Sequence, residues 1–454
     1  MDGLVVSSGA NLTRTLAERA CAVTYDALPE SVRELARQCV LDYFAVGLAG
    51  ADDELVRILL DELSEAGGNQ QAGVIGHAAR LPVLSAALVN GAIAHALDYD
   101  DVHLAMPGHP SVAILPALLA LAEERKASGK QVIAAFIAGY ETCCRVGMSI
   151  RPGHYTRGFH ATGTVGAFGA AAASAYLFGL DAEATGRALG IAGTQSAGLK
   201  SQFGTMCKPF HAGKAAQNGL LAARLAARGF SSRPDLIECE QGFAATHAPD
   251  FFPEKALAEP KQGFHIYGNL FKYHAACYMT HAPIECGRQL REQLGAAPAD
   301  IAAINLILHQ ATDRVCNIPA PTDGLQAKFS LRQTVAMALA GVDTASLGSY
   351  SVKTATDPAL MALRERVNFD FRDDFPEAGA EIEIELKDGR KASAKFDAGI
   401  PNGDIAAQGR RLAEKFDALA APVVGSARAR ELREAIAGLD NLADAGVLAK
   451  LAAK

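Results

Sequence analysis

The sequence contains no tryptophan, and aromatic residues make up only 6% of its 454 residues. It also lacks an excess of positive charge, because 43 lysines and arginines face 50 aspartates and glutamates, for a net charge of −7. Such a chain has no summed positive field to attract nucleic acid or an anionic membrane, so we expect neither as a partner. Half of the residues are apolar, which excludes a disordered chain and provides enough material for a large core.

Targeting signals and long apolar runs are also missing. Residues 1–12, MDGLVVSSGANL, place an acid at position 2 and have no basic region before an apolar run, so we expect no signal peptide. The stretch Ala161–Leu180 comes closest to a membrane span, but its glycines and alanines are equally typical of tightly packed helices in water. We therefore predict a chain that does not enter a membrane and that resides in the cytoplasm.

The nine cysteines form no Cys-x-x-Cys pair, and their odd number indicates a reducing compartment. An iron–sulfur cluster would need three or four thiolates at characteristic spacing, and zinc motifs of the His-x-x-x-His kind are absent, so we expect no metal. The sequence has no Walker loop, no Gly-x-Gly-x-x-Gly after a strand and no Gly-x-Ser-x-Gly turn. Nucleotide binding and serine hydrolysis therefore lack support.

The length predicts two domains, because 454 residues exceed what one hydrophobic core usually organises. Helical periodicity dominates up to about residue 260, and strand-like runs with an Asp-Gly turn appear after it. We predict a mainly α fold with a large all-helical domain, residues 1–268 with 400–454, and a smaller α+β domain, residues 269–399. The predicted segments are helices at Pro29–Gly50, Leu84–Leu97, His109–Glu124, Gln131–Met148, Ala161–Phe178, Ala182–Ala192, Gly213–Arg228, His281–Leu294, Leu331–Leu339, Pro358–Val367 and within Ala406–Leu451, and strands at Ile304–Leu308, Glu381–Leu386 and Lys391–Phe396.

The polar segment that departs most from helix packing is Ala94–Ser111. An apolar helix ends there in three carboxylates, Asp98, Asp100 and Asp101, and a Pro-Gly loop then leads to His109 before a new helix. A histidine at a helix N-terminus is well placed to face a ligand, and the positive helix end favours its neutral, proton-accepting form. The alternative is a turn in solvent, with the histidine as a plain capping residue.

A second polar loop, Arg151–Gly163, contains His160 at the head of a helix rich in glycine and alanine. Together with His109 it places histidines at two helix starts, which suits a base and an acid on opposite sides of one substrate. His154 of the same loop is expected at the surface.

Two lysines complete the candidates. Lys208 precedes Pro209, so we expect an extended backbone there, a side chain that leaves a loop, and a helix that starts near His211. A lysine between apolar segments needs water or an anion, and a substrate carboxylate would supply the anion. The plainer alternative is an exposed side chain. Lys272 and His274 lie where the helical pattern of the first domain gives way to the strand-like pattern of the second. Such a boundary is a usual place for a cleft.

These segments, in this order and spacing, resemble the MmgE/PrpD family, which includes 2-methylcitrate dehydratases, cis-aconitate decarboxylases and iminodisuccinate epimerases. The resemblance implies a large helical domain completed by the C-terminal helices, a smaller α+β lid domain, a homodimer and no cofactor. It also implies catalytic use of Asp98, His109, His160, Lys208 and Lys272. The matching runs are HALDYDDVH (95–103), GHPSVAILPALLALAE (108–123), GFHATGTVGAFGAAAA (158–173), CKPFHAGKAAQNG (207–219) and FKYHAAC (271–277).

The resemblance leaves the choice among members open. Cis-aconitate decarboxylases of the family carry threonine at the position matching Val102 and a tyrosine within the segment matching Arg314–Ile318, and this chain has neither. We therefore predict a cofactor-independent lyase that removes water from a di- or tricarboxylate, as 2-methylcitrate dehydratase does. An epimerase is the first alternative, followed by a decarboxylase or a carboxylate-binding protein without catalytic activity.

The chemistry common to these enzymes builds negative charge on a substrate carboxylate. Lys208 and Lys272 are predicted to stabilise that charge, and either His160 or His109 to take the proton while the other returns one. Asp98 is predicted to orient a histidine or to bind a substrate hydroxyl.

Overall fold

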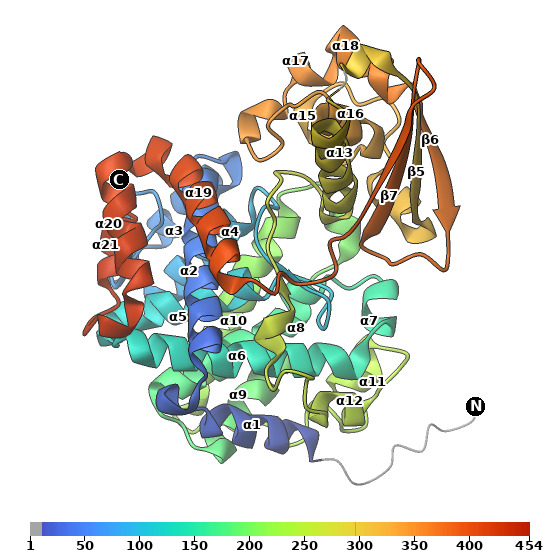
Figure 1. The fold of residues 1–454 in the computed structure, drawn as a ribbon. Coiled ribbons are helices and arrows are strands. Elements are labelled where there is room, and N and C mark those ends of the chain that lie inside the picture. The colour runs from blue at the N-terminus through green and yellow to red at the C-terminus, as the bar shows by residue number, and fades with distance from the viewer. Residues whose placement is uncertain (1–10, 296) are drawn as a thin grey trace. The chain divides into compact units, whose positions relative to one another are not determined.

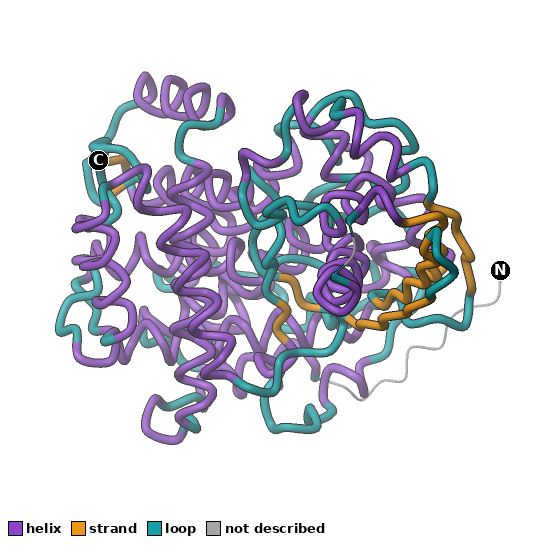
Figure 2. The backbone as a smooth tube through the Cα atoms, turned by 45° about the horizontal axis from the view of Figure 1, so that its top comes forward, coloured by secondary structure: helices purple, strands orange, loops and turns teal. Residues whose placement is uncertain are grey.

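The computed structural model describes residues 11–295 and 297–454, and the chain divides into two compact units. Unit 1 comprises Met1–Phe271 with Asp404–Lys454, and unit 2 comprises Lys272–Gly403. The expectation of no signal peptide concerns residues 1–12, of which 1–10 lie outside the described residues. Helices make up most of the structure and the longer strands gather in unit 2 (Figure 2), so the prediction of a mainly α fold is confirmed.

Unit 1 is organised around α8, whose residues are buried without interruption from Ala161 to Ala175. A helix that is apolar on all sides belongs at the centre of a bundle, and α8 packs against α5, α6, α9 and α10. The helices of unit 1 are α1 (Leu12–Ala22), α2 (Glu30–Gly50), α3 (Glu54–Ala66), α4 (Val83–His95), α5 (Pro110–Arg125), α6 (Gly129–Ile150), α7 (Gly153–Thr156), α8 (Ala161–Phe178), α9 (Ala182–Gly193), α10 (Cys207–Ala226), α11 (Phe243–His247), α12 (Pro253–Leu257), α19 (Ile405–Val424), α20 (Ser426–Ala437) and α21 (Val447–Leu451).

Glycine lets the central helices approach closely. A Cβ atom on Gly213 of α10 would lie 2.1 Å from the carbonyl oxygen of Leu88 in α4, and one on Gly166 of α8 would lie 2.5 Å from the Cβ of Ala113 in α5. Any larger side chain at these positions would force the backbones apart. The small residues of the sequence therefore bring the ends of α4, α5, α8 and α10 near one another.

Two short antiparallel ladders tie loops of unit 1 together. Strand β1 (Ala72–Gly73) pairs with β2 (Arg80–Leu81), and β3 (Val102–His103) pairs with β4 (Asn269–Leu270). The second ladder fixes the polar loop between α4 and α5 to the segment that leaves unit 1.

The C-terminal segment returns to unit 1, as predicted from its apolar positions. Figure 1 shows α19 beside α2, and the two helices pack together. Lys415 of α19 places its Nζ atom 2.6 Å from Asp42 Oδ1 of α2, a contact between residues 373 positions apart. The same ammonium donates a hydrogen bond of 2.8 Å to the carbonyl oxygen of Tyr99.

Unit 2 contains a four-stranded sheet in the order β6-β5-β7-β8, with α13 against β7 and β8. Strand β6 runs parallel to β5, and the other pairings are antiparallel. The elements are β5 (Ile301–His309), β6 (Val367–Arg372), β7 (Gly379–Leu386), β8 (Lys391–Asp397), α13 (His281–Leu294), α14 (Asp313–Cys316), α15 (Gly324–Lys328), α16 (Leu331–Leu339), α17 (Val352–Ala355) and α18 (Pro358–Arg364).

The predicted hairpin of unit 2 is confirmed, since β7 and β8 pair in register across the Asp-Gly turn, where Gly389 has a φ of +87°. The predicted helix Pro358–Val367 is too long, because α18 ends at Arg364 and the chain then forms β6. The alternating sequence of β6, VNFDFR, is a strand signal that the sequence analysis missed.

None of the described helices has both the length and the apolar character needed to cross a bilayer. All nine cysteines are free thiols.

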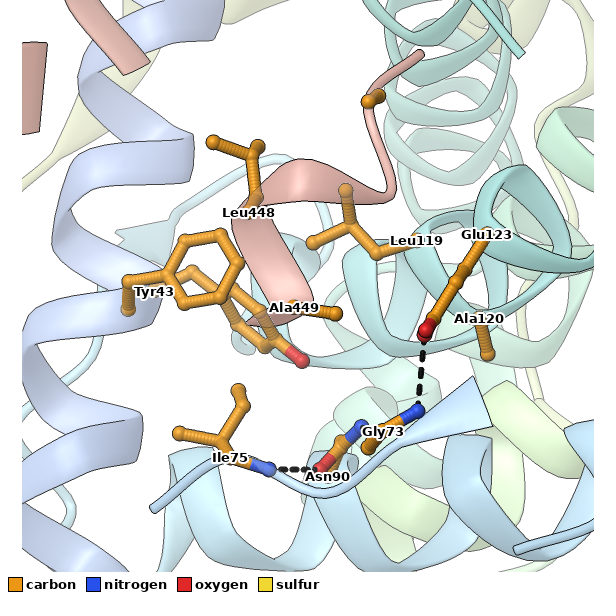
Figure 3. Close-up of a pocket in the computed structure, with 11 residues that line it drawn as sticks. Tyr43, Gly73, Ile75, Asn90, Leu119, Ala120, Glu123, Leu448 and Ala449 are labelled. Atoms are coloured by element: carbon orange, nitrogen blue, oxygen red, sulfur yellow. Dashed lines mark hydrogen bonds between the residues drawn. The ribbon is translucent and has the colours of Figure 1, made fainter. Parts of the chain in front are cut away.

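A small cavity of about 20 Å³ lies among α2, α4, α5 and α21 (Figure 3). Asn90 Oδ1 accepts a hydrogen bond of 2.9 Å from the N–H of Ile75, and Glu123 Oε2 accepts one of 2.8 Å from the N–H of Gly73. About 10–15 Å³ suffices for one water molecule, so this cavity is an ordinary packing void whose polar groups fix the β1 segment.

Candidate active site

Helix ends of unit 1 meet around the ring of His95, the last residue of α4. His109 and His160 directly precede α5 and α8. The ring of His95 lies edge-on to that of His109, with centroids 4.5 Å apart, and stacks on that of His160 at 5.7 Å. The positive ends of two long helices therefore point toward one cluster of imidazoles, where they favour negative charge.

Backbone contacts hold the two helix starts in place. The N–H of His109 donates a hydrogen bond of 3.1 Å to Thr162 Oγ1 in the first turn of α8. The N–H of His160 donates one of 3.0 Å to the carbonyl oxygen of Gly198. The backbone N–H groups of His109 and His160, which have no hydrogen-bond partner in the helix that each residue precedes, thus fix the two residues in place.

Asp98 and Lys208 form the charged side of the cluster. Asp98 Oδ1 lies 2.7 Å from Lys208 Nζ and 3.7 Å from His109 Nε2. Asp98 has a φ of +50°, in the left-handed region that costs a residue other than glycine about 1–2 kcal/mol. Backbone strain of this kind is often stored at functional sites, and here it turns a carboxylate toward a lysine and a histidine.

The backbone prediction for Lys208 is wrong, because α10 begins at Cys207 and Lys208 is its second residue. Proline is tolerated in the first turn of a helix, where the N–H groups have no partner within the helix. Lys208 therefore approaches the cluster from a third helix N-terminus, and its Nζ atom lies 5.4 Å from the centroid of the Phe203 ring.

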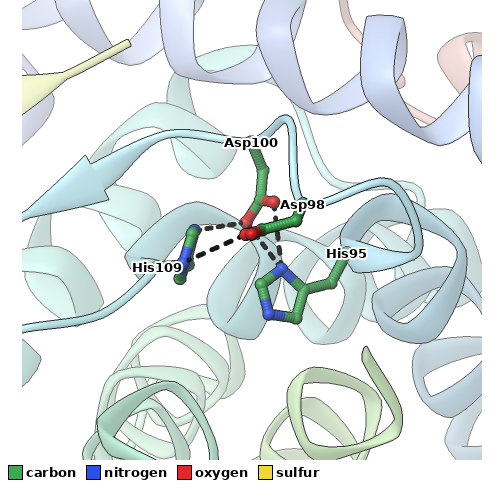
Figure 4. A group of neighbouring side chains, drawn as sticks. All are labelled: His95, Asp98, Asp100 and His109. Carbon is green, nitrogen blue, oxygen red and sulfur yellow. Dashed lines mark hydrogen bonds and ion pairs between the residues drawn. The ribbon is translucent and has the colours of Figure 1, made fainter. Parts of the chain in front are cut away.

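Asp100 joins two of the imidazoles (Figure 4). His95 Nδ1 lies 2.9 and 3.0 Å from the two oxygens of Asp100, and His109 Nδ1 lies 2.9 Å from Asp100 Oδ2. The His95 contact has hydrogen-bond geometry, whereas the His109 ring N–H does not point straight at its carboxylate oxygen. Although burial opposes ionisation, His109 and His95 hold the pKa of Asp100 well below its usual range.

Burial lowers the pKa of His95 to about 4, against the opposing effect of Asp100. Burial, with nearby His95 and Lys208, also places the pKa of His160 well below its usual range. Both imidazoles are therefore neutral at pH 7. His160 Nδ1 lies 3.1 Å from Nδ1 of His211, and the ring of Phe203 lies edge-on at 4.9 Å.

Asp101 differs from its neighbour Asp100. Its Oδ2 atom accepts a hydrogen bond of 2.5 Å from Ser111 Oγ, and burial, with the charge of Asp42, raises its pKa to about 7. The alternative of a turn in solvent is wrong for Asp100 and Asp101, which are each only 1% exposed, whereas the side chain of Asp98 is 26% exposed.

Four of the five predicted site residues come together in this cluster: Asp98, His109, His160 and Lys208. The fifth, Lys272, is the first residue of unit 2, and its catalytic role stays a prediction.

The prediction of a surface position for His154 is wrong, because this residue is 2% exposed and its ring nitrogens contact His247 O at 3.0 Å and Thr164 Oγ1 at 2.7 Å. His274 contacts Glu285 Oε1 and Thr344 Oγ1 within unit 2, so both of its ring nitrogens are occupied.

The sequence analysis missed His95, Asp100 and His211 as site residues. His95 lies within the helix predicted at Leu84–Leu97 and received no role, and Asp100 was grouped with the other carboxylates without a partner. The available signal was their presence in the same polar runs, HALDYDDVH and CKPFHAGK.

The donor atoms of His95, Asp98, Asp100 and His109 lie within 4.8 Å of one another, so these side chains could enclose a metal ion. No sequence motif marks such a set, because its members come from opposite ends of the loop between α4 and α5. However, the ammonium of Lys208 already lies beside Asp98, and a dication next to it would be repelled. The ammonium of Lys208 therefore suits this set of side chains better than a metal ion as the positive charge that balances the carboxylates.

The cavities noted in unit 1 do not contain the cluster. One is the void of Figure 3, and the other, of about 240 Å³, is lined by Arg19, Glu141 and Arg145 among others. The chemistry of the side chains, not a cavity, identifies the candidate site.

Comparison with known proteins gives two family matches. The MmgE/PrpD N-terminal domain model matches residues 14–255, and the MmgE/PrpD C-terminal domain model matches residues 274–441. The chain is similar to a cis-aconitate decarboxylase of Aspergillus terreus, with 28% identity over 476 residues that cover 97% of this chain and 95% of that protein. It is also 28% identical to the human cis-aconitate decarboxylase, over 93% of this chain and 91% of that protein.

Proposed function

Because the chain belongs to the MmgE/PrpD family, we propose that it is a lyase that acts on a di- or tricarboxylate without a cofactor, and that it removes water as 2-methylcitrate dehydratase does. The observation that carries this proposal is the meeting of His109, His160 and Lys208 at three helix N-termini. Imidazoles beside fixed positive charge are what the removal of a proton next to a carboxylate requires.

The proposed reaction begins with proton transfer from the carbon next to a substrate carboxylate to one of the two imidazoles. The electron pair of the broken C–H bond moves toward the carboxylate, whose oxygens gain negative charge. That pair then forms the carbon–carbon double bond, and the C–O bond of the neighbouring hydroxyl breaks. The second imidazole passes a proton to the leaving hydroxide, which becomes water, and is reprotonated by the imidazolium formed in the first step, so that both rings end neutral.

Lys208 would stabilise the charge on the carboxylate, with the positive ends of α5, α8 and α10. Asp98, which holds Lys208 at 2.7 Å, would release it toward the substrate and accept a hydrogen bond from the substrate hydroxyl. We further propose that unit 2 acts as a lid and contributes Lys272 as a second cation. Strand β4, which pairs with the site loop, ends two residues before this lysine.

Decarboxylation is the second candidate, because the relatives reported above are cis-aconitate decarboxylases. In that reaction a C–C bond breaks, carbon dioxide leaves, and an imidazole protonates the remaining carbanion. Val102 and the segment 314–318, where this chain departs from the decarboxylase pattern, favour dehydration. Epimerisation would use the same base without a leaving group.

A panel of citrate-, aconitate- and aspartate-like acids followed by NMR tests the proposal. Dehydration yields an olefinic signal and water, decarboxylation yields carbon dioxide, and epimerisation yields an inverted centre with deuterium incorporated from heavy water. We expect dehydration of at least one hydroxy acid. Absence of turnover with every acid, alongside tight binding of one, would support a binding protein instead.

Two further measurements test the site. His160→Asn is expected to lower kcat by about 10²–10⁴-fold, the usual contribution of a positioned acid or base. Activity is expected to survive EDTA, and its loss on chelation with recovery on adding metal would assign the four-donor set to a metal ion.

We also propose a homodimer, as the family resemblance implies. Light scattering after size-exclusion chromatography measures the mass directly, and a mass near 47.4 kDa would contradict it.

A further inference from the structure

Asp100 is the point at which the buried polar groups of the site converge. It is 1% exposed, it accepts from His95 Nδ1 through both oxygens, and His109 Nδ1 lies 2.9 Å from its Oδ2 atom. A carboxylate this deeply buried needs donors to remain ionised; His95 Nδ1 donates to it, and His109 Nδ1 approaches it without full hydrogen-bond alignment.

The contacts of Asp100 assign the tautomers of both rings. Because an ionised carboxylate can only accept, the nitrogen that faces it carries the proton, so His95 and His109 are both protonated at Nδ1. In the neutral form of the His109 ring the Nε2 atom then carries no proton, and its distance of 3.7 Å from Asp98 Oδ1 is too long for a hydrogen bond that would fix a proton there. Since Asp98 pairs with Lys208, the basic nitrogen of His109 faces the charged side of the site.

From this geometry we propose that Asp100 and His95 are positioning residues for His109: Asp100 orients the imidazole and balances its charge when it takes up a proton, and His95 holds Asp100 in place. The inference rests on the proposed function and names a chain of contacts behind one of its two histidines. Among the described residues no equivalent carboxylate contacts the ring of His160, whose Nδ1 atom lies beside another imidazole, His211.

The proposal assigns different roles to His109 and His160. When His109 takes a proton at Nε2, it becomes an imidazolium whose Nδ1–H faces an anion, so the charge is balanced without reorganisation. The poor alignment of the His109–Asp100 contact is expected in the absence of substrate, since catalytic hydrogen bonds often tighten only when substrate binds. His160 has neutral or positive neighbours and is the less favourable site for the charged form.

His95 is suited to positioning, not to reacting. Its side chain is fully buried, and its Nδ1 atom is committed to Asp100. Its Nε2 atom has no hydrogen-bond partner among the described residues, so the ring is held from one side by Asp100 and from the others by its contacts with His109 and His160. Variants of His95 can therefore test whether its Nδ1–H donor is the feature on which kcat depends.

Three variants measure these roles. Asp100→Asn keeps the shape but removes the charge, and we expect kcat to fall by about 10²–10⁴-fold with KM changed by less than about threefold. His95→Asn keeps a donor near the position of Nδ1, whereas His95→Leu removes it. We expect His95→Asn to retain at least about ten times the kcat of His95→Leu, because a lost hydrogen bond to a charged group costs about 1.5–3 kcal/mol.

A matched control is His103→Asn. His103 is another buried histidine of the same loop, but its ring contacts His265 O at 2.8 Å and the N–H of Ala105, not Asp100. We expect this variant to lose stability with little change in kcat. Equal losses of kcat in all folded variants would overturn the proposal in favour of a packing role, as would an Asp100→Asn enzyme within threefold of the wild type.

Nitrogen NMR of histidine-labelled protein supplies a readout that does not depend on turnover. The signal of His109, assigned by its loss in His109→Asn, is expected to show a protonated Nδ1 and a bare Nε2 at pH 7, and the opposite tautomer would overturn the proposal. This spectrum also covers the case in which Asp100→Asn does not fold. A wild-type protein that turns over none of the acids but shows the expected tautomer would contradict the proposed function, not the positioning contacts.

Discussion

Lys415–Asp42 and Lys208–Asp98, two of the lysine–aspartate pairs of unit 1, have similar distances and different surroundings. Lys415 Nζ lies 2.6 Å from Asp42 Oδ1, with side chains 5% and 2% exposed, and it also donates to the carbonyl oxygen of Tyr99. Lys208 Nζ lies 2.7 Å from Asp98 Oδ1, with side chains 14% and 26% exposed. The first pair is enclosed by protein on all sides, whereas the second is partly open and one of its members has strained backbone.

The difference teaches that the surroundings of an ion pair, more than its length, decide its use. A closed pair with further protein partners holds elements together, and removing one member leaves a buried charge. A half-open pair can exchange its partner for a ligand with little cost to folding. The two pairs act on neighbouring residues, because Lys415 donates to the carbonyl oxygen of Tyr99, and Tyr99 directly follows Asp98.

The largest effect is expected when the closed pair is broken. Lys415→Met should lower the free energy of unfolding by about 3–5 kcal/mol, because Asp42 keeps its buried charge without the ammonium. Urea unfolding measures the loss, and Lys450→Met, at an exposed position of α21, is the control. A loss below about 1 kcal/mol would remove the distinction between the two pairs.

Breaking the half-open pair should affect activity instead. Lys208→Met is expected to lower kcat/KM by about 10²–10³-fold, as loss of one charge-stabilising group usually does. The free energy of unfolding should change by less than about 1 kcal/mol, since water can reach Asp98. Lys214→Met, on the same helix but paired with Gln217, serves as the control. Undiminished binding of every acid by the folded Lys208→Met protein would show that this lysine does not bind substrate.

A double variant sharpens the comparison. Adding Asp42→Leu to Lys415→Met removes the charge that the single variant leaves buried, and it should recover about 1–3 kcal/mol of the loss. The same urea experiment measures the recovery. If the double variant is no more stable than Lys415→Met, the loss comes from packing of the lysine side chain.

Acid should weaken the fold because most of its perturbed histidines are held neutral. The pKa of His95, His103 and His154 lies near 4 in the folded protein, below the ordinary value of 6.5, and burial is the main cause in each case. The unfolded chain therefore binds protons first as the pH falls from about 6.5 to 4, and stability declines across that window. Asp101 and Glu141, each with a pKa raised to about 7 by burial, act in the opposite direction.

Each histidine that these carboxyl groups do not offset contributes about 1.4 kcal/mol per pH unit. The midpoint of urea unfolding measured at pH 7, 6 and 5 is expected to fall steadily. A midpoint that rises on acidification would show that the buried carboxyl groups dominate.

The helices of unit 1 could be predicted because their signals are local. Helix α8 was expected at Ala161–Phe178 and has those bounds, since a run of alanine and glycine followed by Gly179 leaves little choice. Helix α10 begins earlier than expected, because the preference of a residue before proline for extended backbone yields to the tolerance of a first helical turn.

Site residues could be predicted from the sequence where they stand directly at the end of a recognisable helix. His109 and His160 stand just before long apolar helices, which is visible in the sequence. The pairing of His95 with Asp100 depends on a left-handed turn at Asp98 and on helices that touch only after folding, and no local pattern encodes it.

The hydrogen bond from Lys415 to the carbonyl of Tyr99 has a consequence for how the protein matures. The loop that carries Asp98 and His109 emerges early from the ribosome, but the lysine that secures it is synthesised among the final residues. A nascent chain that ends before α19 would contain the histidines of the site but would lack the lysine that holds their loop. The site would therefore become active only when synthesis is nearly complete.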